Sequence, residues 1–238
     1  MAFLENQNEE PGFISKRVHR RMFMKYAGAA AATSAFLVAG CKDDEEVDKG
    51  MPDAEVDLGS GDTGVLNYAY ALEQLEAAFY TAVVAEASFT SIFNDEEQTV
   101  MRDLMAHEIT HREFFKAALG TNAIPGLEVD FSSINFADKA SVLGAAKTFE
   151  DLGVAAYNGA GKLLTDGNLL LAAGKIVSVE ARHAAAIRDL IDPKSASFSG
   201  DDVVDANGFD KAMVPADVLS AAATYVKTKI NASNLPTS

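Results

Sequence analysis

Two four-residue units of the same form decide the fold: Glu108-Ile109-Thr110-His111 and Glu180-Ala181-Arg182-His183. In each Glu-x-x-His unit the two side chains stand three residues apart, so that they share one face of a helix. The neighbouring positions on these faces are apolar, among them Leu104, Phe115 and Ile187. We therefore expect both units to lie on amphipathic helices with the glutamate and histidine turned into the core.

A single glutamate stands upstream of each unit. Glu73 precedes the first unit by 35 residues and Glu150 precedes the second by 30, and a tyrosine follows each of these glutamates after seven positions, at Tyr80 and Tyr157. The repeated order indicates an internal duplication, in which two halves face each other across a pseudo-twofold axis. It favours Glu73 over Glu76 as the ligand position, and it leaves Glu76 as an extra ligand or a hydrogen-bond partner of the ligands.

Two Glu-x-x-His units and a glutamate from each of two further helices form the ligand set of di-iron and di-manganese carboxylate bundles. Four buried carboxylates repel one another and take up protons, whereas two divalent cations balance their charge and suit mixed oxygen and imidazole ligands. The sequence therefore predicts a centre of two iron or manganese ions. The predicted ligands are Glu73, Glu108, His111, Glu150, Glu180 and His183, with Glu76 as the additional candidate. Tyr80 and Tyr157 are predicted to line this centre as hydrogen-bond donors or radical traps, with plain aromatic packing as the alternative.

Four long helical patterns carry these residues. They span about 62–87, a stretch from Asn94 to Gly120, about 138–164 and about 168–191. The connections are short, long and short, which is the connectivity of a ferritin-like bundle with one long crossover. A Ser-, Asp- and Gly-rich loop follows over 192–214, and a final helix is predicted over 215–230. The predicted fold class is an all-α four-helix bundle over 62–191, with a loop and a short C-terminal helix over 192–238.

His107 and His111 also match the His-Glu-x-x-His pattern of zinc metalloproteases. That motif needs a third ligand and a substrate cleft beside a sheet, but the chain has no clear strand pattern. It also gives no account of the second Glu-x-x-His unit. A zinc protease is therefore a remote alternative.

The first forty residues have the features of an export signal. The seven residues His19-Arg20-Arg21-Met22-Phe23-Met24-Lys25 resemble the twin-arginine motif. Val38-Ala39-Gly40-Cys41 resembles a lipobox, in which the cysteine carries a lipid. We expect residues 1–40 to be a twin-arginine lipoprotein signal peptide, Cys41 to be lipidated, and residues 41–61 to form an acidic flexible tether. These features predict a lipid-anchored protein of the cell envelope, on its periplasmic or surface side.

The composition excludes several classes of partner and cofactor. A formal net charge of −15 leaves no basic surface for phosphates, which argues against nucleic acid as a partner. Cys41 is the only cysteine in the chain, so zinc ribbons and cysteine-held iron–sulfur clusters lack ligands.

The segments Leu66–Tyr80, His107–His111 and Val179–Ala184 resemble the bacterial ferritin-like family that includes desiccation-related proteins. The resemblance covers about residues 62–191 and implies the same helical bundle. It also implies O₂ or peroxide as reaction partners, because relatives include ferroxidases, peroxide reductases and manganese catalases. A di-metal oxidoreductase with a role in stress protection is therefore expected. A non-catalytic metal-binding or desiccation-protective protein stays the alternative, and the oligomeric state stays open.

Overall fold

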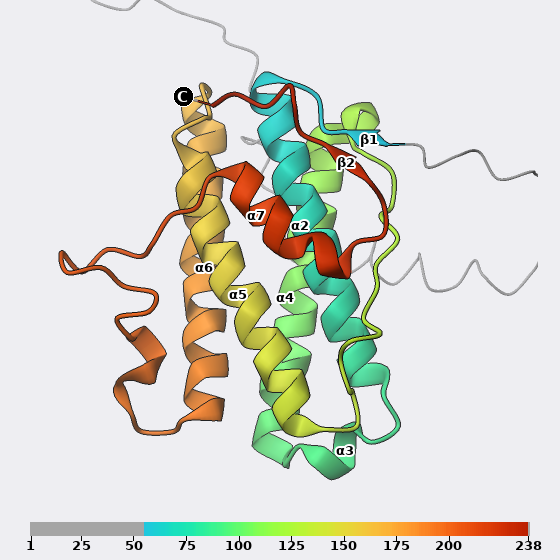
Figure 1. The fold of residues 1–238 in the computed structure, drawn as a ribbon, viewed down its shortest axis with the longest axis vertical. Coiled ribbons are helices and arrows are strands. Elements are labelled where there is room, and N and C mark those ends of the chain that lie inside the picture. Colours follow the sequence, from blue (N-terminus) through green and yellow to red (C-terminus); the bar gives the residue numbers. More distant parts are fainter. Residues whose placement is uncertain (1–54, 238) are drawn as a thin grey trace, which may run out of the picture. The chain divides into compact units, whose positions relative to one another are not determined.

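The computed structural model describes residues 55–237, which form an all-α bundle (Figure 1). The four long helices are α2 (Gly61–Ala85), α4 (Asp95–Leu119), α5 (Lys139–Gly161) and α6 (Gly167–Ile191). The shorter elements are α3 (Phe89–Ile92), α7 (Pro215–Ala222), the 3-10 helices η2 (Gly120–Asn122), η3 (Ala196–Ser199) and η4 (Ala223–Tyr225), and the strands β1 (Val56–Asp57) and β2 (Ile230–Asn231). The predicted fold class is confirmed. In the described part of the chain, no helix is long and apolar enough to cross a membrane.

The helices form two antiparallel pairs, because α2 packs mainly along α4 and α5 mainly along α6. The connection between the pairs, residues 120–138, is the long crossover that the sequence predicts. Aromatic contacts fix this crossover to the core. The ring centroids of Phe131 and Phe136 lie 5.9 and 6.0 Å from that of Phe79 on α2, and Phe131 also contacts Phe149 on α5.

Side-chain caps set the starting points of three helices. Asn94 forms a reciprocal capping box with Glu97, in which each side chain accepts a hydrogen bond at 3.0 Å from the other residue's backbone N–H. The Asp138 side chain accepts a hydrogen bond from the Ser141 N–H at the start of α5. The Asp166 side chain accepts one from the Asn168 N–H at the start of α6. These caps satisfy amide groups that the helices leave unpaired, so the helix starts are encoded locally.

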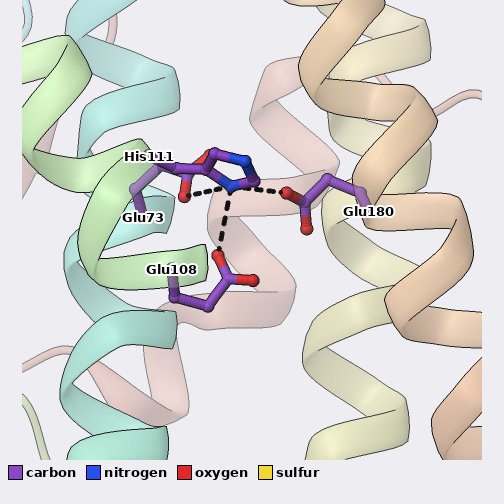
Figure 2. Close-up of side chains that lie close together, drawn as sticks. All are labelled: Glu73, Glu108, His111 and Glu180. Carbon is purple, nitrogen blue, oxygen red and sulfur yellow. Dashed lines mark ion pairs between the residues drawn. The ribbon is translucent and has the colours of Figure 1, made fainter. Parts of the chain in front are cut away.

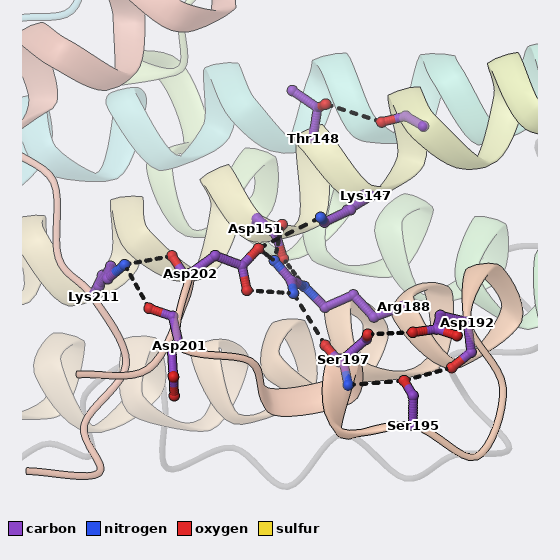
Figure 3. Close-up of polar contacts among 11 residues, drawn as sticks. Lys147, Thr148, Asp151, Arg188, Asp192, Ser195, Ser197, Asp201, Asp202 and Lys211 are labelled. Carbon is purple, nitrogen blue, oxygen red and sulfur yellow. Dashed lines mark hydrogen bonds and ion pairs between the residues drawn. The ribbon is translucent and has the colours of Figure 1, made fainter. Parts of the chain in front are cut away.

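Arg188 fixes the loop after α6 to the bundle (Figure 3). Its guanidinium is buried, and it donates two hydrogen bonds to Asp151 on α5, at 2.7 and 2.8 Å. It donates two more to Asp202 in the loop, at 2.8 and 3.0 Å, and one to the Ser197 carbonyl. One side chain on α6 therefore joins α5, α6 and the loop that follows.

Two predictions near the ends of the described region were wrong in extent. The tether was expected to reach residue 61, but Val56 and Asp57 pair with β2 and the Leu58 side chain is completely buried. The final helix was expected to reach residue 230, but it ends at Ala222. Residues 225–231 form backbone hydrogen bonds with the crossover and with β1, and these tertiary bonds replace the helical ones. The predicted signal peptide and the lipidation site Cys41 lie outside the described residues.

The segment before α7 lies directly on α5 at a glycine. A Cβ on Gly159 would lie 1.7 Å from the Met213 carbonyl oxygen, and the Met213 N–H donates to the Ala155 carbonyl at 2.9 Å. By contrast, a Cβ on Gly144 of the same helix would meet no atom within 4 Å. The chain thus offers two glycines in one helix, one at a close contact and one in open space.

We expect Gly159→Ala to lower the free energy of unfolding by about 1 to 3 kcal/mol, because the backbone of the docked segment must move. Gly144→Ala should raise it by up to about 1 kcal/mol, since alanine favours the helix more than glycine does. Chemical denaturation followed by circular dichroism measures both. Equal effects of the two substitutions would contradict the close docking of residue 213 on α5.

Candidate metal centre

Six polar side chains from the four long helices meet inside the bundle. They are Glu73 on α2, Glu108 and His111 on α4, Glu150 on α5, and Glu180 and His183 on α6. Each glutamate lies at or next to the midpoint of its helix, so antiparallel packing brings the four carboxylates to one level. The glutamates have no exposed surface, and the two histidine side chains are 12% and 6% exposed. These six are the residues that the sequence predicts as ligands.

One group of ligand atoms surrounds His111 (Figure 2). Its Nδ1 lies 2.9 Å from Glu180 Oε1, 3.5 Å from Glu73 Oε2 and 3.6 Å from Glu108 Oε2. The three carboxylates come from three different helices, α2, α4 and α6. The nearest of them belongs to the other Glu-x-x-His unit, so this group joins both halves of the chain.

A second group surrounds His183 in the same way. Its Nδ1 lies 2.7 Å from Glu108 Oε1, 3.5 Å from Glu150 Oε2 and 3.6 Å from Glu180 Oε2. Glu108 and Glu180 therefore belong to both groups, and each presents one oxygen to one histidine and the second oxygen to the other. Glu73 and Glu150 belong to one group each. Two shared and two unshared carboxylates, with one imidazole on each side, form a symmetric two-centre arrangement.

The separations fit ligand atoms that share an ion. Atoms bound to one metal ion at about 2.1 Å are themselves about 3.0 to 3.4 Å apart in octahedral or tetrahedral geometry, and the contacts described above span 2.7 to 3.6 Å. Eight buried nitrogen and oxygen atoms of these six residues have contacts only with one another, and no hydrogen-bond partner outside the cluster, in the described part of the chain. Unpaired buried polar atoms are costly, and cations at the two centres would satisfy them.

In the metal-free protein, burial and neighbouring charges shift the pKa values of Glu73, Glu108 and Glu150. Burial and the neighbouring glutamates raise the pKa of Glu73 well above its usual value, although His111 opposes the shift. Burial likewise raises the pKa of Glu150 to about 8. For Glu108, burial acts upwards too, but contacts with both histidines outweigh it and lower the pKa to about 2. Part of the cluster therefore carries protons near neutral pH when no cation is bound.

For the two histidines, contacts with the carboxylates act against burial. Burial alone would lower the pKa of His111 and of His183, but the surrounding carboxylates outweigh burial and raise both pKa values to about 12. Without metal, each ring therefore carries a positive charge at the place where a cation would bind. Because a metal ion coordinates the neutral imidazole, metal binding must displace these protons.

The two tyrosines connect the halves of the site. Tyr80 on α2 donates a hydrogen bond of 2.5 Å to Glu150 Oε1 on α5, and Tyr157 on α5 donates to Glu73 Oε1 on α2. In each case the second oxygen of the glutamate is the one near a histidine. The tyrosines thus orient the two unshared carboxylates, and their role as radical traps stays a prediction.

Glu76 lies beside the cluster but in neither ligand group. It is buried, and burial together with the other glutamates raises its pKa well above the usual value. A Cβ on Gly153 would lie 3.0 Å from Glu76 Oε1 and 3.7 Å from Glu180 Oε2, so the missing side chain of Gly153 makes room for this carboxylate. The sequence signal for Gly153 was available: it follows Glu150 by three residues, as Glu76 follows Glu73.

His107 contacts a predicted ligand from the outside. Its Nδ1 lies 2.9 Å from His183 Nε2, and the two rings stack with centroids 5.1 Å apart. It belongs to neither ligand group. His107 and His111 are therefore not arranged around one ion as the zinc-protease motif requires. The contact was not predicted, because it joins residues on different helices.

Comparison with known families agrees with this geometry. A model of the ferritin-like domain matches residues 61–193, a stretch that contains the four long helices and all six residues of the cluster. The chain has no match among curated proteins.

The pKa shifts predict proton release on metal binding. Adding Fe²⁺ or Mn²⁺ to metal-free protein in weak buffer at neutral pH should release about two protons per chain from the histidines, and more from the protonated glutamates. For the same reason, metal affinity should rise with pH. A pH indicator and calorimetry in buffers of different ionisation enthalpy measure the release. Metal binding without proton release would contradict the protonated state of His111 and His183.

Proposed function

Because the chain belongs to the ferritin-like domain family, we propose that its buried cluster binds two iron or manganese ions that react with O₂ or peroxide. The observation that carries the proposal is the sharing of Glu108 and Glu180 between the two histidines, each glutamate giving one oxygen to each side. One ion would be held by Glu73 and His111 and the other by Glu150 and His183. The two shared glutamates would hold both.

Two ions bound in this way would supply a pair of centres, each able to give up one electron to an oxidant. The protein contributes burial, which keeps bulk water from the carboxylates, and orientation, which comes from the tyrosine hydrogen bonds. Burial and the adjacent glutamates raise the pKa of Tyr80 and of Tyr157 well above 10. Both phenols therefore keep their protons and continue to donate to Glu150 and Glu73 over the physiological pH range.

The symmetry of the cluster predicts how single substitutions change metal content. Glu108→Gln or Glu180→Gln should reduce two ions per chain to none, because each glutamate serves both centres. Glu73→Gln should leave one ion, held on the His183 side. Glu96→Gln, on the exposed first turn of α4, is the matched control and should retain two. Elemental analysis after anaerobic loading gives the counts. One ion retained in both Glu108→Gln and Glu180→Gln would contradict the shared arrangement.

The same samples separate an enzyme from a non-catalytic metal-binding protein. Anaerobic ferrous protein is mixed with O₂ or with hydrogen peroxide, and the ferric product is followed by its ultraviolet absorbance. Rapid oxidation in the wild type and in Glu96→Gln, but not in Glu108→Gln, supports the proposed reaction. Two ions that stay ferrous under both oxidants would support a structural or protective role.

We also propose that the protein works at the cell envelope, anchored by a lipid on Cys41 and exported by the twin-arginine route. The proposal rests on the twin arginine, on the uncharged, alanine-rich run over residues 26–40 and on the lipobox-like residues. Replacing Arg20 and Arg21 with Lys should leave unprocessed protein in the cytoplasm, and Cys41→Ser should abolish labelling by a radioactive fatty acid. Unchanged envelope delivery of the Arg20→Lys, Arg21→Lys variant would contradict the export route.

A further inference from the structure

A small apolar cavity lies beside the cluster. Its walls come from α2, α4, α5 and α6, and every atom that forms its surface is apolar. The positions open to the centre of a water-sized molecule fill about 20 Å³, and by this measure one water needs roughly 10 to 15 Å³. The cavity therefore has room for a guest of one or two heavy atoms.

The cavity extends along the bundle axis away from the cluster. On α2 the lining residue Leu72 directly precedes Glu73, and on α4 the lining residue Phe115 follows His111 by four positions. On α2 the lining continues back to Val65, eight residues from Glu73, which corresponds to about 12 Å of helix. Its outer part is formed by half-buried residues, among them Leu164 and Ala173. One end is therefore next to the ligand set and the other lies near the surface.

The lining decides which molecules can use this space. Apolar walls offer water no hydrogen-bond partner, and enclosed apolar cavities bind guests such as xenon. An ion or a peroxide molecule would lose its hydrogen bonds to water and find no partner on these walls. Dioxygen is uncharged, apolar and diatomic, so it matches both the size and the chemistry of the cavity.

The inner end has a direct connection to the site. The Tyr157 ring lines the cavity, and its hydroxyl donates to Glu73 in the His111 group. The ring of Phe115 packs beside it, with centroids 6.4 Å apart. A guest in the cavity would thus be separated from the Glu73 carboxylate by the tyrosine that orients it.

We propose that this cavity binds dioxygen and leads it to the Glu73 side of the metal centre. The delivery role rests on the proposed function, whereas binding of an apolar gas does not need the metal. The proposal therefore selects dioxygen rather than peroxide as the oxidant that uses this route.

Xenon is the probe for the cavity, because its binding needs no metal. Xenon NMR titration of the full chain, or crystals under xenon pressure, should show one site between Leu72 and Ala173. Ala173→Phe, at the half-buried outer end, should remove that site. Ala172→Phe is the matched control, since Ala172 is equally half-buried but does not line the cavity. Gly161→Leu is a second blocking variant, because a Cβ there meets only Leu170 at an ordinary 3.6 Å.

The rate experiment uses the same variants loaded with ferrous ion. Ala173→Phe and Gly161→Leu should slow oxidation by O₂ at least about tenfold relative to Ala172→Phe, while oxidation by peroxide changes little. Absence of xenon from the wild type, or equal O₂ rates in Ala173→Phe and Ala172→Phe, would overturn the proposal. Xenon binding in a protein that takes up no metal would support the gas site and refute only the proposed function.

Discussion

Four carboxylates buried at one level of a helical bundle are the constraint on which the rest of the structure depends. Such a cluster is unfavourable unless positive charge is placed among the oxygens. In the protein alone, the protonated rings of His111 and His183 provide it, since the carboxylates raise both pKa values to about 12. Two divalent cations would provide more charge at the same places. The distances of 2.7 to 3.6 Å between histidine nitrogens and carboxylate oxygens fit ion pairs in the metal-free protein. They also fit atoms that bind one cation together.

The order of glutamate and tyrosine repeated along the chain corresponds to the symmetry of the site, and the positions that break the repeat make the two sides of the site differ. Tyr80 and Tyr157 repeat the same contact in opposite directions. In contrast, Glu76 of the first half corresponds to Gly153 in the second, and one carboxylate occupies the space that the missing side chain leaves. The carboxyl group of Glu76 would therefore be an extra acidic neighbour of the two ions. Of the two histidines in the cluster, His183 contacts a further imidazole, that of His107 on α4.

Chain segments outside the four long helices pack on α5 and α6, two of the helices that carry predicted ligands. Arg188 connects α6 to Asp151, the residue after Glu150, and to the loop that follows. The segment before α7 lies on α5 at Gly159, so α5 is fixed on two sides. A ligand on α5 thus depends on contacts with chain segments far away in sequence.

Much of the fold could be predicted from local sequence, because helix periodicity, caps and the long crossover are local properties. Asn94 and Gly120 mark the ends of α4, and the spacing of Glu108 and His111 places both on one face. Long-range contacts were not predictable in this way. The chain after Ala222 leaves the helix because its backbone bonds to the crossover and to β1, and Leu58 joins the core through the same strand pairing.

The sequence by itself determined which residue types share a helix face, and hence the six side chains that gather at the centre. Only the tertiary structure decided which glutamates are shared between the histidines, because that depends on the relative rotation of four helices and not on spacing within one. It also decided that His107 meets His183 and that Gly153 faces Glu76. Contacts between helices depend on packing, which a periodic pattern constrains but does not specify.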